Sequence, residues 1–132
     1  DFVEQNTEGM GKYPESTYSL KITGNFDQHS LIKSKKIPVT LGTNYTISVF
    51  ANTLDLNGTL HFYVDEFDEQ GEWTTGVWLG ELETGKIETF FRDYTPSSSL
   101  LKNASLSIYT NPETLGSAYV DRVQWFDKTL YE

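Results

Sequence analysis

The sequence contains no cysteine, which excludes disulfides, thiolate metal sites and thiol catalysis. It also lacks any run approaching the roughly 20 apolar residues of a membrane-spanning helix, so we expect no membrane insertion. Basic residues are scarce, with 10 Lys and Arg against 19 Asp and Glu and a net charge of −9. A nucleic-acid partner is therefore not expected, because a phosphate backbone demands clustered cations.

Sequence signatures of catalysis are equally scarce. The two histidines, His29 and His61, lie in unlike contexts, without the spacings of a zinc site. There is no Gly-X-Ser-X-Gly elbow and no phosphate-binding glycine loop. Asp65 and Glu66 suggest the carboxylate pair of a glycosidase, but neighbouring residues of one strand point to opposite faces. We predict that the chain is not an enzyme.

The strongest positive signal is a period of two in hydrophobicity between residues 42 and 67. The first segment has apolar residues at every second position, namely Tyr45, Ile47, Val49 and Ala51. The second segment has Leu60, Phe62 and Val64 on one face and His61, Tyr63, Asp65 and Phe67 on the other. Such alternation predicts two half-buried β-strands with one face on a core.

Similar alternation recurs along the chain, and no segment has a sustained helical period. Eight strands spaced about 12 residues apart predict an all-β fold, a two-sheet antiparallel β-sandwich that is most economically a jelly roll. We expect a single domain over residues 1–132, in which residues 1–16 are irregular or a partial N-terminal strand.

A standard jelly roll would place the strands near residues 30–38, 59–67, 73–79 and 104–110 in one sheet. The outward residues of this sheet would be His61, Tyr63, Asp65, Trp78 and Tyr109, a mixture of rings and polar groups that is unusual for a solvated surface. The other sheet would expose Phe50, Glu88, Phe90, Arg92 and Tyr94, and we rank it second. Trp73 is interpreted as a possible cap at the sandwich edge. Lys33, Lys35 and Lys36 are interpreted as keeping a sheet edge soluble.

Rings beside fixed polar groups suit a sugar ligand. A sugar presents flat C–H faces ringed by hydroxyls, so aromatic side chains can cover the apolar face while polar groups bind the hydroxyls. The first sheet therefore predicts polysaccharide binding through His61, Tyr63, Asp65, Trp78 and Tyr109. Arg92 and Tyr94 are the candidates on the second sheet.

Four segments resemble the jelly-roll carbohydrate-binding modules of families four, nine and twenty-two. They are residues 18–24 (YSLKITG), 37–48 (IPVTLGTNYTIS), 90–96 (FFRDYTP) and 118–123 (AYVDRV), in the order found in those modules. The resemblance implies a non-catalytic module that binds a polysaccharide or oligosaccharide on its concave sheet. It also implies a structural calcium ion held by Asp121, with Glu4 as a candidate second carboxylate. The alternative for Asp121 is a carboxylate that hydrogen-bonds backbone.

Composition and resemblance together predict an accessory domain of a larger secreted or cell-surface protein, which leaves neighbouring domains as further partners. The chain starts at Asp1, so we expect a mature product or an excised piece of that protein. The alternative is a structural or interaction sandwich of a cell-envelope or phage protein, in which a neighbouring domain covers the aromatic sheet.

Overall fold

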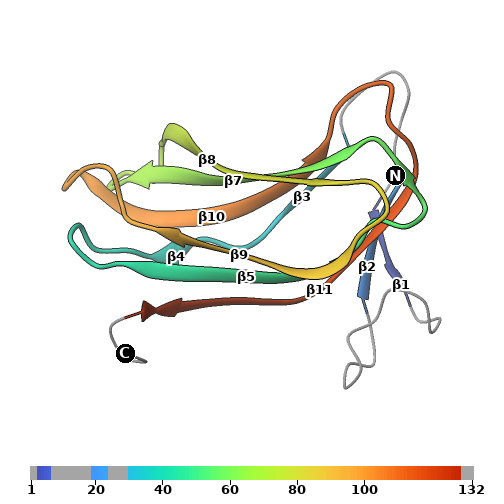
Figure 1. The fold of residues 1–132 in the computed structure, drawn as a ribbon. Helices are drawn as coiled ribbons and strands as arrows, with labels where there is room; N and C mark the ends of the chain where they lie inside the picture. Colours follow the sequence, from blue (N-terminus) through green and yellow to red (C-terminus); the bar gives the residue numbers. More distant parts are fainter. Residues whose placement is uncertain (1–2, 7–18, 24–29, 129–132) are drawn as a thin grey trace.

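The computed structural model describes residues 3–6, 19–23 and 30–128, which form two antiparallel sheets packed face to face (Figure 1). The six-stranded sheet has the order β1 (Val3–Asn6), β2 (Ser19–Thr23), β11 (Leu115–Asp127), β5 (Tyr45–Asn52), β9 (Ile87–Tyr94), and β6 (Leu56–Asn57) pairs with β11. The five-stranded sheet has the order β3 (Ser30–Lys33), β10 (Leu101–Thr110), β7 (Thr59–Asp68), β8 (Trp73–Glu83), and β4 (Ile37–Pro38) pairs with β10. The predicted sandwich is confirmed, and so is the grouping of four segments in one sheet.

One hydrophobic core lies between the sheets, and the alternating segments build it. Ile47, Val49 and Ala51 of β5 face Leu60, Phe62 and Val64 of β7, and all six side chains are buried. Burying an aliphatic or aromatic side chain of this size contributes about 1.5–3 kcal/mol. The apolar residues that alternate along these two segments of the sequence are therefore the residues that form the core.

Strand β9 alternates as predicted, but the side chains that were expected on its outer face point into the core. Phe90 and Tyr94 are buried, whereas Ile87 and Phe91 are 55% and 61% exposed. The Phe90 ring stacks on Phe62 of the other sheet with 4.0 Å between centroids. The prediction that Phe90 and Tyr94 point outward is wrong, because the two faces of this strand are almost equally apolar and a one-residue shift exchanges them.

A buried carboxylate also joins the two sheets. Glu66 lies on the inner face of β7 and is fully buried. Its Oε2 accepts hydrogen bonds from the Tyr94 hydroxyl at 2.5 Å and the Ser97 N–H at 3.2 Å, and its Oε1 accepts one from Ser97 Oγ at 2.6 Å. Burial, followed by the bond to Glu66, raises the pKa of Tyr94 far above the usual value for a phenol.

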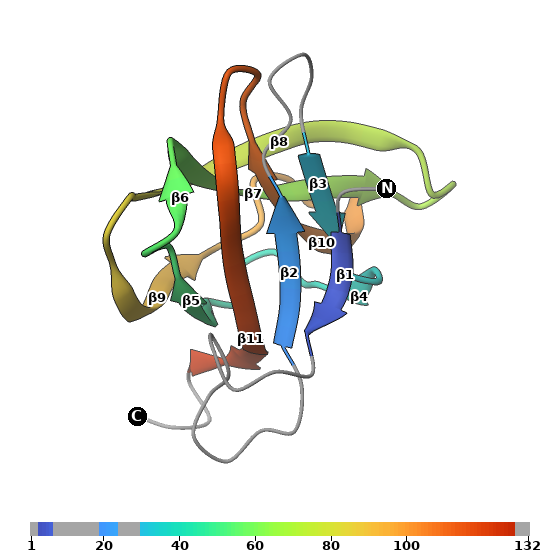
Figure 2. The same cartoon turned by 90° about the vertical axis from the view of Figure 1, so that its right-hand side faces the viewer.

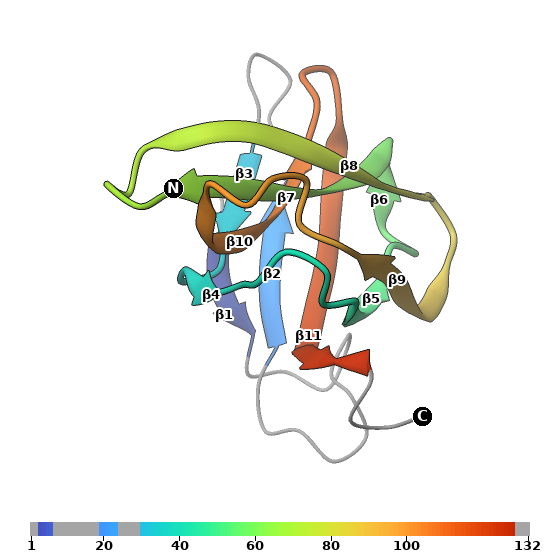
Figure 3. The same cartoon turned by 90° about the vertical axis from the view of Figure 1, so that its left-hand side faces the viewer.

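Strand β8 extends beyond its predicted end at Leu79 because of a bulge. Tyr63 pairs with Trp78 and Phe62 with Gly80, so Leu79 is the extra residue and Gly80 adopts a φ of +140°. The extra residue reverses the alternation, which brings Leu82 into the core and Glu81 onto the outer face beside His61. Figure 3 shows β7 and β8 running side by side as long neighbouring strands.

At the N-terminus, Val3–Asn6 forms β1, which pairs with β2, and β2 pairs with β11 (Figure 2). The predicted partial strand is thus present. The remainder of residues 1–16, together with Tyr18 and His29, lies outside the described residues. In the described part of the chain, no helix has the length and apolarity needed to cross a membrane.

Candidate functional site

Four rings meet on the outer face of the five-stranded sheet. His61 and Tyr63 come from β7, Trp78 from β8 and Tyr109 from β10, and strand pairing sets Tyr109 opposite His61 and Trp78 opposite Tyr63. His61 stacks on Tyr109 with 5.0 Å between ring centroids, and Tyr63 stacks on Tyr109 at 5.5 Å. Trp78 contacts Tyr63 edge-on at 5.1 Å and His61 at 5.6 Å. We call this surface the aromatic face.

The rings support one another, which keeps each in a defined orientation. Trp78 is 46% exposed, and the other three rings are half-buried. Burial, followed by a hydrogen bond with Tyr63, raises the pKa of Tyr109 to about 12. The Tyr109 hydroxyl therefore stays protonated at neutral pH and remains able to donate and accept hydrogen bonds.

Asp65 lies next to the rings and is the polar centre of the aromatic face. Its Oδ1 accepts a hydrogen bond from Trp73 Nε1 at 3.1 Å, and its Oδ2 accepts one from Ser107 Oγ. Lys33 Nζ lies 3.8 Å from the same Oδ2. The Asp65 side chain is only 15% exposed, and its hydrogen bond with Trp73 holds the indole against the sheet.

Gly76 lies on β8 between the two exposed tryptophans of that strand. A Cβ atom at this position would lie 3.6 Å from Asp65 Oδ1 and from Tyr63 Cδ1, and 3.9 Å from Trp73 Cζ2. These are ordinary contact distances, so the backbone there does not require glycine. Glycine at this position adds no side chain to the surface between Trp73 and Trp78.

Polar groups border the rings on the side away from Asp65. His61 Nε2 lies 2.9 Å from the side-chain nitrogen of Asn111, a pairing in which the amide donates and the imidazole nitrogen accepts. Glu81 is exposed and pairs with His61 across the strands. The aromatic face thus presents apolar rings in the middle and hydrogen-bonding groups at its margins.

The structure brings together all five residues of the first-ranked set, His61, Tyr63, Asp65, Trp78 and Tyr109, and separates them from the second-ranked pair. Tyr94 is buried in the core and bonded to Glu66, so its prediction as an exposed ligand-binding residue is wrong. Arg92 is exposed, but it belongs to the other sheet. Its guanidinium lies 4.3 Å from the Phe90 ring centroid, and its Nη1 donates to the Phe91 carbonyl at 2.8 Å.

The two predicted calcium ligands, Asp121 and Glu4, come from strands that are not direct neighbours in the sheet. Asp121 Oδ1 accepts the Arg122 backbone N–H at 2.7 Å, the kind of bond that the alternative interpretation expected. Glu4 lies on β1, which is separated from β11 by β2, so about 10 Å lies between the two backbones. Among the described residues, no group of three or more His, Asp or Glu side chains is placed to hold a metal ion. Calcium binding stays a prediction.

Trp73, Ser107 and Gly76 are members of the site that the sequence interpretation did not include. The sequence does contain a signal for Trp73. If the residues on the two sides of the turn after Asp68 are paired in order, Trp73 lies opposite Phe67, which is two residues from Asp65 in β7. Ser107 alternates with the apolar Leu106 and Ile108, a pattern that indicates an outward side chain, but nothing in the sequence marks it as a partner of Asp65. The importance of Gly76 depends on its neighbours in space, which no local pattern reveals.

No family model matches the sequence, and no curated protein matches it significantly. Among solved structures, it is similar to the tailspike protein 4 enzymatically active domain of Bacteriophage CBA120, with 12% identity and a TM-score of 0.71 over 93% of this chain. It is also similar to the CBM22-1 xylan-binding domain of Paenibacillus barcinonensis Xyn10C, with 14% identity and a TM-score of 0.60 over 93% of this chain and 80% of that domain.

A third similar structure is the CBM22-1–GH10 portion of Clostridium thermocellum xylanase 10B in complex with xylohexaose, with 17% identity and a TM-score of 0.67 over 96% of this chain. This chain spans 17% of the tailspike chain and 24% of the xylanase chain. At these identities the likeness establishes the fold, which is the jelly-roll sandwich that carbohydrate-binding modules share.

Proposed function

We propose that the chain is a non-catalytic carbohydrate-binding module that holds a polysaccharide across the aromatic face, as an accessory domain of a larger secreted or cell-surface protein. The observation that carries the proposal is the contact among His61, Tyr63, Trp78 and Tyr109 on one outer face, bordered by fixed polar groups. Similar solved domains are described as xylan-binding or are complexed with xylohexaose, which supports a glycan as the ligand.

The ligand would lie with the C–H face of one sugar ring against Trp78 and an adjacent ring near the open surface at Gly76. Such stacking contributes on the order of 1 kcal/mol per ring beyond the buried area. Because the surface is open, many sugar hydroxyls would remain in water, and affinity would be modest. The residues assigned to direct contact are Trp78, Tyr63 and Tyr109, with His61 at their margin. Asp65 acts as a positioning residue through Trp73.

Isothermal titration with xylan, β-glucan and mannan oligosaccharides tests the proposal, after a glycan array has selected the best ligand. We expect Trp78→Ala and Tyr63→Ala each to weaken binding by about tenfold or more, which corresponds to the loss of roughly 1.4 kcal/mol. Leu100→Ala is the matched control, since Leu100 is 73% exposed and lies in the loop between β9 and β10, away from the aromatic face.

Absence of binding to every glycan, or binding that both aromatic variants leave intact, would overturn the proposal. Self-association of the isolated domain that Trp78→Ala abolishes would favour the alternative, in which a neighbouring domain covers the aromatic face.

The predicted structural calcium has a separate test. If Asp121 and Glu4 help to hold the ion, EDTA lowers the melting temperature, added calcium restores it, and Asp121→Asn removes the response. A melting temperature that is insensitive to EDTA and calcium would overturn this part while leaving the glycan proposal untouched.

A further inference from the structure

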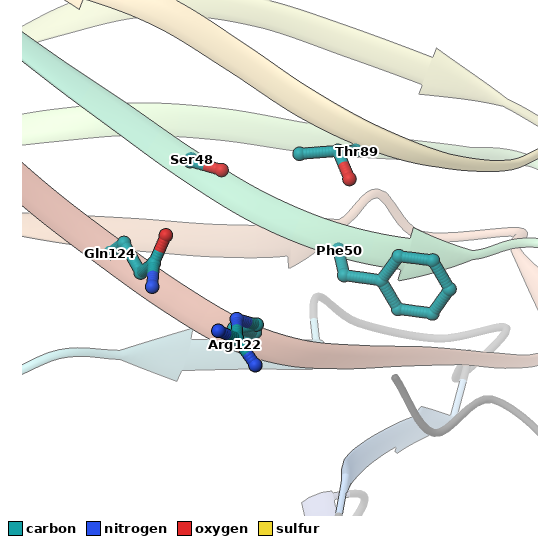
Figure 4. Close-up of a pocket in the computed structure, with 5 residues that line it drawn as sticks. All are labelled: Ser48, Phe50, Thr89, Arg122 and Gln124. Carbon is teal, nitrogen blue, oxygen red and sulfur yellow. The ribbon is translucent and has the colours of Figure 1, made fainter. Parts of the chain in front are cut away.

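The outer face of the six-stranded sheet has a small hollow, opposite in the sandwich to the aromatic face. Its lining residues come from three neighbouring strands: Ser48 and Phe50 from β5, Thr89 from β9, and Arg122 and Gln124 from β11 (Figure 4). The hollow has a volume of about 50 Å³. A water molecule accounts for about 30 Å³ in the liquid, so there is room for a group of only a few atoms.

A β-bulge places Arg122 in this lining. Asp121 pairs with Phe50 and Gln124 pairs with Ser48, so β11 has one more residue than β5 between these pairs. Val120 is buried, and regular alternation would turn Arg122 toward the same inner side. Instead Arg122 adopts a φ of +50°, a left-handed conformation that is uncommon for a residue with a Cβ atom, and its side chain is exposed.

The bulge costs conformational energy and is stabilised by a hydrogen bond to the Asp121 side chain. A non-glycine residue in the left-handed region costs on the order of 1 kcal/mol, and such conformations occur preferentially at functional sites. The Asp121 side chain stabilises the turn by accepting the Arg122 backbone N–H at 2.7 Å. Bulges often redirect a side chain, and here the effect is to add a guanidinium to the polar groups of the outer face.

The chemistry of the lining identifies a ligand class. Arg122 is the one charged side chain among the five, and a guanidinium has five N–H donors in a planar fork that fits a carboxylate. Ser48, Thr89 and Gln124 add two hydroxyls and an amide, which suit sugar hydroxyls. Phe50 and the 61% exposed Phe91 on the neighbouring strand offer apolar surface beside the hollow.

We propose that this hollow is a second ligand site that binds the carboxylate group of an acidic sugar, with the carboxylate on Arg122 and the sugar ring against Phe50. The site is separate from the aromatic face and does not depend on it. The net charge of −9 makes nonspecific uptake of acidic polymers unfavourable, so binding of an acidic sugar would report a specific contact.

The test compares glucuronic acid with glucose, which differ only in the carboxylate at C6, using amide shifts in nuclear magnetic resonance spectra. We expect glucuronic acid to shift the amides of Ser48, Thr89 and Gln124 and to bind at least about tenfold more tightly than glucose at this site. Arg122→Gln should weaken this binding by about tenfold or more, and Trp78→Ala should leave it unchanged.

Thr89→Ala is the second variant, because it keeps Arg122 and its backbone conformation intact; it should weaken glucuronic acid binding several-fold. Equal binding of glucose and glucuronic acid, binding insensitive to Arg122→Gln, or shifts confined to the aromatic face would each overturn the proposal. Acetate as effective as glucuronic acid would overturn the sugar ligand in favour of a bare anion. Tighter binding of an aspartate-rich peptide would overturn it in favour of a protein partner.

Discussion

Asp65 and Glu66 are adjacent carboxylates that face opposite sides of β7 and have different roles. Asp65 fixes Trp73 on the aromatic face, whereas Glu66 accepts three hydrogen bonds inside the core. The separation of this pair, predicted from strand geometry, removes the basis for a two-carboxylate glycosidase mechanism at these residues. Each carboxylate instead positions another residue.

The buried Tyr94 predicts a loss of stability at alkaline pH. Its pKa is raised in the folded protein above the ordinary 10.0, so the folded state retains the proton more strongly than the unfolded chain does. The resulting stabilisation is fully present below about pH 10 and is lost as the pH rises toward the folded pKa. Urea unfolding monitored across this range should show a smaller alkaline decline for Tyr94→Phe than for the parent protein.

Tyr109 also has a raised pKa and provides the comparison, because Tyr109→Phe should reduce the decline as well. A decline in Tyr94→Phe as steep as in the parent would contradict the assigned role of Tyr94.

Substitution of Gly76 should change glycan binding without lowering the stability of the fold. Gly76→Val places a branched side chain between Trp73 and Trp78, in a strand that favours such residues, and its Cβ atom would lie at ordinary contact distances from its neighbours. We expect a melting temperature equal to or above that of the parent and at least about tenfold weaker glycan binding. Retained affinity in a folded Gly76→Val protein would show that the sugar does not use the surface between these tryptophans.

At the scale of the element, β9 shows how far sequence pattern determines facing. Consecutive Phe90 and Phe91 give both faces of this strand a large ring, and the period alone cannot select the inner one. In β7 the choice was clear, because Leu60, Phe62 and Val64 alternate with His61, Tyr63 and Asp65. The sequence therefore predicted the aromatic face but not the exposed side of β9.

The two phenylalanines of β9 provide a matched test of this facing. Phe90→Ala removes a fully packed ring that stacks on Phe62 and should cost about 3–5 kcal/mol in the free energy of unfolding. Phe91→Ala removes a 61% exposed ring on the next residue and should change stability by no more than about 0.5 kcal/mol. Chemical denaturation of both variants measures the difference, and equal costs would contradict the facing described here.

Bulges explain most of what the sequence could not predict in the strands. The extra residues near Leu79 in β8 and Arg122 in β11 each reverse the alternation, and neither occurs at a site marked by a turn motif. They place Glu81 on the aromatic face and Arg122 on the opposite outer face. The alternation of β7 indicates that Glu66 points inward, but it does not predict the hydrogen-bond partners of this carboxylate. These partners, Tyr94 and Ser97, come from the other sheet and from a loop.

At the scale of the whole molecule, the excess of nine negative charges predicts a response to salt. Repulsion among like charges destabilises the compact state, and roughly 0.5 M NaCl screens it almost completely beyond a few ångströms. We expect the melting temperature to rise by a few degrees between low salt and this concentration. The exposed Lys128–Asp93 pair opposes the trend only weakly. A melting temperature that falls with NaCl would indicate that specific ion pairs outweigh the overall repulsion.

Strand β7 has a consequence for how this molecule can change over generations. Its even-numbered residues from Leu60 to Glu66 fill the interior and its odd-numbered residues from His61 to Asp65 supply the exterior, so one codon gained or lost inside the strand would exchange the two sets together. Point substitutions can tune either set separately, whereas a change in length would abolish both at once. A change of length in a loop does not exchange the two faces of a strand, although the loop after Pro96 is constrained by the two hydrogen bonds that Ser97 donates to Glu66.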